Sequence, residues 1–230
     1  MDMLDKSHKA SLRERNLLTK TSFLKDLTGP SLARVLDAAT VFSFPARTTI
    51  FQEGEPALAF YSVLAGYVRI YRVSRDGRQA DIRICGPGDI FAECLIYGGD
   101  AYRFSAQAAE NVSLARFDMQ DIRQAANDDI AVARSVITAL SQHLLSTMDC
   151  VVNDRLHTAP QRVADYLINR CPIETGQASI RLPFQKNLLA GMLGLAPEAL
   201  SRAFSTLRRA GVTVRGRVIQ ISDIDALRRF

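Results

Sequence analysis

The sequence predicts an α+β protein in which a β-roll, a long helix and a winged helix-turn-helix follow one another. Short β-type runs separated by turn residues occupy positions 40–118. Positions 128–155 lack Gly and Pro and repeat apolar residues at helical spacing. Positions 183–209 read as two helices joined at a glycine, and a short hairpin follows them. These three observations give the order of the parts.

The first part, residues 1–127, is expected to be a β-roll of the jelly-roll type. Its β-type runs are short and are separated by turns that contain glycine. The clearest hairpin signal is Asp76-Gly77, which lies between the runs Tyr67–Val73 and Ala80–Ile84. Short antiparallel strands at this spacing close into a compact sandwich or barrel.

The second part, residues 128–157, is expected to be one long dimerisation helix. Its apolar residues follow a heptad pattern. The seam consists of Ile130, Ala133, Ile137, Leu140, Leu144, Thr147 and Val151. A helix of about 28 residues is about 40 Å long, which is more than a small β domain needs. We therefore expect the seam to pair with a second copy of the chain, with packing on its own domain as the alternative.

The third part, residues 158–230, contains the most informative motif. Its first helix is expected over Gln185–Leu193, and Gly194 follows where a tight turn needs a positive φ. The second helix, Pro197–Arg208, begins with a proline that suits a first helical turn. Two β-type runs around Arg215-Gly216-Arg217 then predict a hairpin, the wing.

Charge and side-chain placement in this third part indicate DNA as a partner. Residues 159–230 contain eleven Arg or Lys and five Asp or Glu, a net charge of +6, whereas the preceding residues have a net charge of −1. Glu198, Ser201 and Arg202 share one face at the start of the second helix. Arg can donate two hydrogen bonds to guanine, and Glu can accept one from cytosine. A solvated Glu–Arg ion pair is the alternative interpretation of this spacing.

Contacts to DNA phosphates are predicted from polar and basic residues near the helix starts and in the wing. Such contacts position a protein on the duplex and carry no sequence information. The predicted residues are Gln185, Lys186, Arg208, Arg215 and Arg217.

Composition argues against several other classes. No run of eighteen apolar residues indicates a membrane span, and the charged N-terminus lacks a secretory signal, so a cytoplasmic location is expected. The residue pattern shows no nucleophile–base set, metal spacing or phosphate loop, which disfavours an enzyme. The cysteines are scattered, and we expect reduced, mostly buried thiols. They are Cys85, Cys94, Cys150 and Cys171.

Taken together, the motifs resemble the Crp/Fnr family of bacterial regulators over roughly residues 30–230. The matching roll segments are Ile50-Phe51-Gln52-Glu53-Gly54, Gly66-Tyr67-Val68-Arg69, Asp76-Gly77, Gly88-Asp89 and Phe91-Ala92-Glu93. The segment from Pro197 to Arg202 resembles an Fnr-like recognition helix, which implies the half-site TTGAT. The resemblance also implies a sensory roll like a cyclic-nucleotide-binding domain, a homodimer, and double-stranded DNA and RNA polymerase as partners.

The resemblance leaves the effector open. Cyclic-nucleotide members carry a Gly-Glu pair and, ten residues after the Glu, an Arg-Ser pair. Glu93 and Arg103 keep that spacing here, but Ala92 and Phe104 replace the glycine and the serine, which disfavours cAMP. Glu93 and Arg103 could instead form an internal ion pair.

Within the family, the sequence is most similar to the dissimilatory nitrate respiration regulators (Dnr and NnrR). Residues 1–84 contain no cysteine, so no Fnr-type iron–sulfur cluster is expected. Cluster-free members of this branch respond to nitric oxide, which implies haem as a cofactor, although the sequence identifies no metal ligand. The predicted effector pocket comprises Glu93, Arg103, Leu140 and His143, with a surface histidine as the alternative for His143. A cyclic-nucleotide-responsive regulator and a ligand-binding module that acts through protein contacts are the alternative functions.

Overall fold

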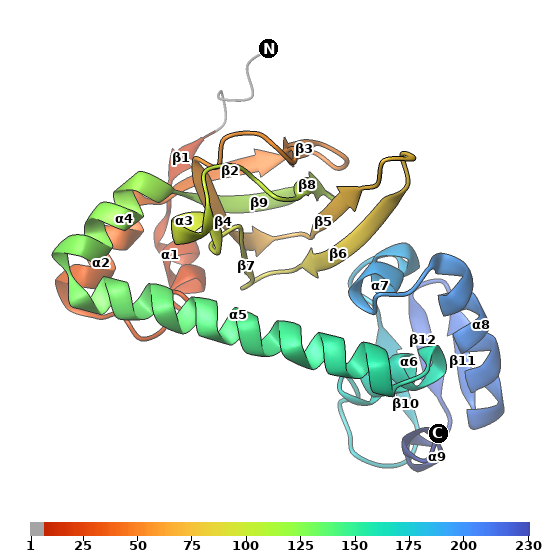
Figure 1. Cartoon of the computed structure of the whole chain (residues 1–230). Helices are drawn as coiled ribbons and strands as arrows, with labels where there is room; N and C mark the ends of the chain where they lie inside the picture. The colour runs from red at the N-terminus through yellow and green to blue at the C-terminus, as the bar shows by residue number, and fades with distance from the viewer. Residues whose placement is uncertain (1–6) are drawn as a thin grey trace. The chain divides into compact units, whose positions relative to one another are not determined.

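The computed structural model describes residues 7–230. The chain divides into two compact units within its longest helix, between Ser146 and Thr147. The long helix is therefore shared by the two units and does not form a unit of its own. Figure 1 labels the elements, which are described below one unit at a time.

The N-terminal unit is a β-roll made of two antiparallel sheets, as the spacing of short strands predicts. One sheet has the strand order β1-β2-β9-β4-β7 and the other β3-β8-β5-β6. The strands are β1 (His8–Lys9), β2 (Thr40–Phe44), β3 (Thr49–Phe51), β4 (Ala59–Ala65), β5 (Val68–Val73), β6 (Gln79–Cys85), β7 (Ile90–Phe91), β8 (Ser105–Ala108) and β9 (Val112–Asp118). The predicted hairpin is confirmed: β5 pairs with β6, and Gly77 turns the chain at φ 80°.

Short helices complete this unit around an aromatic core. They are α1 (Leu12–Leu18), α2 (Gly29–Ala38), α3 (Leu95–Gly98) and α4 (Met119–Asp128). Phe60 stacks on Phe117 at 5.0 Å between ring centroids, and Phe23 packs edge-on against both. Burial of such rings is a large source of stability for the roll.

The long helix α5 (Ile130–Leu156) begins two residues later than predicted. Asp128 ends α4, and Asp129 breaks the helix in an extended conformation. The Asp129 carboxylate then accepts a hydrogen bond from the Ala131 amide at 2.8 Å, which starts the new helix.

Two faces of α5 have different surroundings. Val132, Ser135, Val136 and Ala139 are buried in the N-terminal unit, so the helix does pack on its own domain. The heptad seam lies on another face and is largely exposed in the single chain. The exposed fractions are 69% for Ile130, 62% for Ile137, 62% for Leu144 and 45% for Val151. Leu140 is half-buried against the core of the roll.

The C-terminal unit is a small winged helix-turn-helix. Its elements are α6 (Ala159–Ile168), β10 (Ala178–Arg181), α7 (Lys186–Met192), α8 (Pro197–Leu207), a 3-10 turn (Arg208–Ala210), β11 (Val212–Arg215), β12 (Val218–Ile221) and α9 (Ile224–Arg228). The three strands pair in the order β10-β12-β11. Thr158 caps α6 reciprocally with Gln161, as its position before Pro160 suggests.

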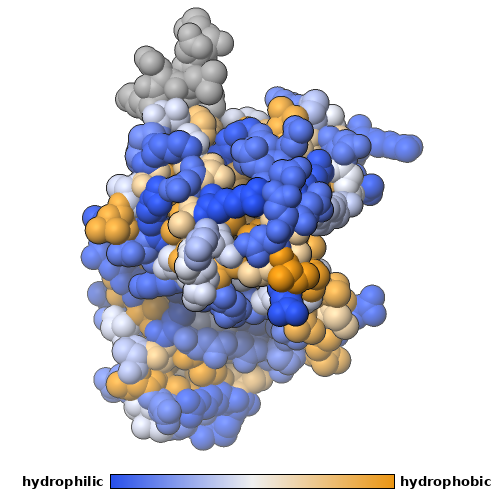
Figure 2. Space-filling view, turned by 90° about the vertical axis from the view of Figure 1, so that its left-hand side faces the viewer, coloured by the Kyte–Doolittle hydropathy of each residue, from blue (hydrophilic) through white to orange (hydrophobic). Residues whose placement is uncertain are grey.

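The surface of the molecule bears on two predictions, the lack of a membrane span and the burial of the cysteines. Most of the face drawn in Figure 2 is hydrophilic, with separate hydrophobic patches, and no described helix is long and apolar enough to cross a bilayer. Of the thiols predicted to be buried, only Cys85 is; Cys94 and Cys150 are exposed and Cys171 is half-buried. Cys150 lies on the exposed part of α5, where the neighbouring side chains leave its thiol open to solvent.

Candidate nucleic-acid interface and effector pocket

The turn between α7 and α8 is built as the sequence predicts. Gly194 has φ 60°, the left-handed conformation that glycine adopts most easily. The Leu195 amide closes the turn by donating to the Ala190 carbonyl at 2.9 Å. Gln185 occupies the N-cap position just outside α7 without a side-chain capping hydrogen bond, and the last turn after α8 tightens into the 3-10 turn. Both predicted helices are therefore present, each slightly shorter than expected.

The three predicted base-reading residues lie together on the exposed face of α8. Glu198, Ser201 and Arg202 are exposed, whereas Leu200 and Phe204 are buried on the opposite face. In the described part of the chain, neither Glu198 nor Arg202 has an ion-pair partner. The alternative of a Glu–Arg ion pair is therefore wrong, and both charged groups face solvent at the helix start, where a recognition helix meets base edges.

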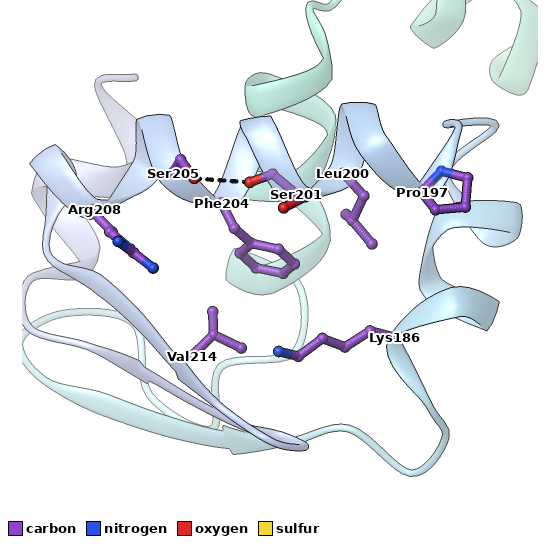
Figure 3. Close-up of a pocket in the computed structure, with 8 residues that line it drawn as sticks. All are labelled: Lys186, Pro197, Leu200, Ser201, Phe204, Ser205, Arg208 and Val214. Atoms are coloured by element: carbon purple, nitrogen blue, oxygen red, sulfur yellow. Dashed lines mark hydrogen bonds between the residues drawn. The ribbon is translucent and has the colours of Figure 1, made fainter.

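A groove runs between α8 and the wing. Figure 3 shows Phe204 and Val214 facing each other across it, with Lys186 on one side and Arg208 on the other. The groove has a volume of about 270 Å³ and also reaches Ser201. Two of the predicted phosphate contacts thus flank an apolar floor beside a predicted base-reading residue.

The remaining phosphate candidates lie at the wing and at the start of α7. Gln185, Arg215 and Arg217 are exposed. Gly216 turns the hairpin at φ 59° between the two arginines. The Arg217 guanidinium also donates to the Pro183 carbonyl at 3.3 Å, so it braces the segment that leads into α7. Arg217 therefore has a structural contact that spacing alone does not indicate.

The N-terminal unit contains a polar pocket of about 200 Å³ between the roll and α5. Glu93 is 1% exposed. Its Oε1 contacts Nδ1 of His143, and its buried Oε2 has no hydrogen-bond partner among the described residues. Nε2 of His143 lies 3.4 Å from Nη1 of Arg83, which forms an ion pair with Asp89 at 3.2 Å through Nη2.

The charges in this pocket alternate in sign. Burial disfavours the Arg83 cation, but the negative groups around it, including Asp89 and Glu93, more than offset this, and the pKa of Arg83 is raised. The His143 ring lies between the two charges, with Nδ1 in contact with the Glu93 carboxylate and Nε2 facing the Arg83 guanidinium. The alternative of a surface histidine is therefore wrong, because this side chain joins α5 to the roll.

Arg103 does not join this pocket. Its side chain is exposed and lines a separate hollow with Glu53, Arg72 and Tyr102. The internal Glu93–Arg103 ion pair is therefore wrong: Glu93 pairs with His143 instead. The ten-residue spacing between Glu93 and Arg103 is kept in sequence, but it does not bring the two charges together.

Comparisons with known proteins identify the family. The cyclic nucleotide-binding domain profile matches residues 41–129, and the Crp-like helix-turn-helix domain profile matches residues 161–230. The nitrogen fixation regulation protein FixK of Rhizobium meliloti is 30% identical over 182 residues, which cover 78% of this chain and 81% of the relative. The chain belongs to the Crp/Fnr family of DNA-binding transcriptional regulators.

Solved structures of Crp/Fnr regulators agree in fold along most of the chain. FixK2 from Bradyrhizobium japonicum has a TM-score of 0.68 and 30% identity, over 83% of this chain and 96% of that chain. DNR from Pseudomonas aeruginosa has a TM-score of 0.56 and 27% identity, over 97% of this chain and 100% of that chain. The β-roll, long helix and helix-turn-helix predicted from the sequence are therefore confirmed.

The structure shows the surroundings of Ala92 and Phe104, the two positions at which this Crp/Fnr chain departs from the cyclic-nucleotide pattern. Ala92 is buried and has φ 66°, a left-handed conformation that glycine adopts more easily than alanine. The resemblance implies glycine at this position in cyclic-nucleotide members. Phe104 is half-buried and packs 5.9 Å from Phe51 within an aromatic cluster. An apolar ring thus occupies the position at which the resemblance implies a serine in cyclic-nucleotide members.

The described residues of the pocket do not fit haem ligation by His143. An imidazole binds iron through one unprotonated ring nitrogen. Nδ1 of His143 contacts Glu93, and its Nε2 faces Arg83. The pocket is also below the range of about 300–1,000 Å³ typical of organic-ligand sites. His8 and His157 pair with Glu14 and Asp165 elsewhere.

Sequence analysis alone missed Arg83, Asp89 and Arg162. Arg83 lies between Ile82 and Ile84 in a β-type run, and a charged residue inside such a run is a sequence signal for a functional or paired side chain. Arg162 is only 16% exposed and contacts both Asp154 and the Leu193 carbonyl. Nothing in the local sequence of α6 distinguishes it from a solvated arginine.

Proposed function

We propose that this Crp/Fnr regulator is a homodimer that reads an Fnr-like palindrome with the half-site TTGAT through Glu198, Ser201 and Arg202. The observation that carries the proposal is that the ionic groups of Glu198 and Arg202 are exposed together at the start of α8, without an ion-pair partner among the described residues. Two recognition helices would then lie about 34 Å apart, one turn of DNA. RNA polymerase is proposed as a further partner on the family resemblance alone.

Dimerisation through α5 is supported by the exposed heptad seam. Ile130, Ile137, Leu144 and Val151 recur every seventh residue and stay largely outside the single chain's own core. Water contact of so many aligned apolar side chains is unfavourable, and a second copy of the same helix would remove it.

The experiment for this function is a gel-shift titration with the duplex TTGAT-N4-ATCAA and a scrambled duplex over a range of salt concentrations. The proposal predicts at least roughly a thousandfold preference for the palindrome and an affinity that falls steeply with salt. Equal affinities for the two duplexes would sink the proposed site. No shift on either would favour the alternative module that acts through protein contacts.

The polar pocket is proposed as the effector site, for a small polar molecule that donates a hydrogen bond to Glu93. The buried, unpartnered Oε2 of Glu93 supports this, since a buried carboxylate oxygen without a donor is costly. Effector binding would shift the population of α5 orientations and so the DNA-reading state.

Nitric oxide sensing through haem is a second proposal, which rests on the family resemblance of the sequence alone and needs a haem ligand other than His143. Protein purified with haem supplied gives the test: a Soret band that shifts with nitric oxide supports haem, and a flat Soret region rules it out. Adding cAMP to the same preparation in the gel-shift assay tests the cyclic-nucleotide alternative.

A further inference from the structure

A single arginine joins three elements of the C-terminal unit. Arg162 lies in the first turns of α6 and is 16% exposed. Nη1 of its guanidinium donates to the Asp154 carboxylate in the last turns of α5 and, at 3.0 Å, to the Leu193 carbonyl at the end of α7. The guanidinium thus lies between the end of α5 and the turn that precedes α8.

The turn approaches this ion pair closely. A Cβ placed on Gly194 would lie 3.4 Å from Oδ1 of Asp154 and 3.5 Å from Nη1 of Arg162. A side chain at this position would therefore be in van der Waals contact with both charged groups. The Asp154–Arg162 pair is linked to the turn through the Leu193 carbonyl, which directly precedes Gly194.

Electrostatics favour a cation at this place. The last carbonyls of a helix lack intrahelical partners and carry partial negative charge. Arg162 satisfies one such carbonyl, at Leu193, and neutralises Asp154 near the C-terminal end of α5. Because α6 also packs against α8, the same helix that carries Arg162 supports the recognition helix.

We propose that Arg162 is a positioning residue that fixes the recognition helix relative to the end of α5, so that sequence-specific DNA binding depends on its bridge between Asp154 and Leu193. This inference rests on the proposed function. Arg162 is not a DNA contact in this account. It acts through the turn, and its loss would lower discrimination between duplexes more than affinity for DNA in general.

The decisive variant is Asp154→Ala. It removes the α5 side of the bridge but leaves the Leu193 carbonyl with its donor. It also makes the protein more positive, and electrostatics alone would then strengthen binding to every duplex. The proposal predicts the opposite for the palindrome: specific affinity falls about 5- to 150-fold, the usual range for coupling between sites, while affinity for the scrambled duplex stays level or rises.

Arg162→Gln and Arg170→Gln form a matched pair, because each removes one positive charge from the α6 region. Arg170 is exposed just beyond α6 and stacks on Tyr166 at 4.7 Å. Both variants should lose the same small amount of affinity for the scrambled duplex, and only Arg162→Gln should lose discrimination. Circular dichroism of each variant checks that the unit is folded; if Arg162→Gln unfolds, Asp154→Ala decides alone.

The outcomes separate the two proposals. If the wild-type chain does not distinguish the palindrome from the scrambled duplex, the proposed function fails. If the wild type distinguishes them and Asp154→Ala does so equally well, the proposed function stands and the role of Arg162 is overturned.

Discussion

Truncating Leu144 to alanine should weaken dimerisation strongly. Complete burial of a leucine side chain is worth about 1.5–3 kcal/mol, and Leu144 is 62% exposed in the single chain. Burying the remaining surface on two copies would therefore contribute roughly 2–4 kcal/mol to the dimer. Its loss corresponds to about a 30- to 700-fold higher dissociation constant, measured by sedimentation equilibrium.

Leu145 provides a matched control for this prediction. It is the next residue of α5, has the same side chain and is 61% exposed, but it lies off the heptad seam. Leu145→Ala changes helix propensity and surface area as Leu144→Ala does, so any difference between them reports the seam itself. Equal effects of the two variants, or a wild-type chain that is monomeric at high concentration, would refute the reasoning.

Three further predictions concern other sites. Lys186→Ala should weaken binding to cognate and scrambled duplexes alike and reduce the salt slope by about one; a loss confined to the cognate duplex in fluorescence anisotropy would contradict a phosphate role. His143→Ala should lower the free energy of unfolding, measured by urea titration, by about 1–3 kcal/mol, because Glu93 loses its partner. Adding Glu93→Gln to this variant should recover part of the loss, and an unchanged urea midpoint for His143→Ala would argue against the pair. Burial raises the pKa of the Cys85 thiol to about 12, so this thiol stays protonated at pH 8. Mass mapping after treatment with iodoacetamide should therefore find the label on Cys150 before Cys85, and early labelling of Cys85 would be inconsistent with its burial.

The sequence specifies the C-terminal unit well because its signals are local. A positive-φ glycine at 194, a proline at the first position of α8 and a basic turn in the wing each fix the backbone within a few residues. The heptad period of α5 is equally local, and it locates a face that the single chain leaves exposed. The local sequence does not specify which partner surface packs against that face.

The effector pocket could be predicted only in part, because it is made by long-range packing. Glu93 and His143 are 50 residues apart in sequence and meet only because α5 packs on the roll. The ten-residue spacing of Glu93 and Arg103 suggested an ion pair, but a spacing along strands and loops does not set a distance in space. Arg162 was missed for the same reason, since its acceptor at Leu193 is 31 residues away.

The most direct test of the central claim combines one variant with one base-pair change. Wild-type protein and Arg202→Ala are titrated against the TTGAT palindrome and against a duplex in which the G·C pair of each half-site is replaced by A·T. The account predicts that the wild type loses about 1–3 kcal/mol per altered pair, and that Arg202→Ala loses clearly less, because the guanine contact is already gone and only the contact of Glu198 with cytosine can still distinguish the pair. If Arg202→Ala still prefers the unaltered palindrome by the wild-type margin, Arg202 does not read that base pair and the assigned reading face is wrong.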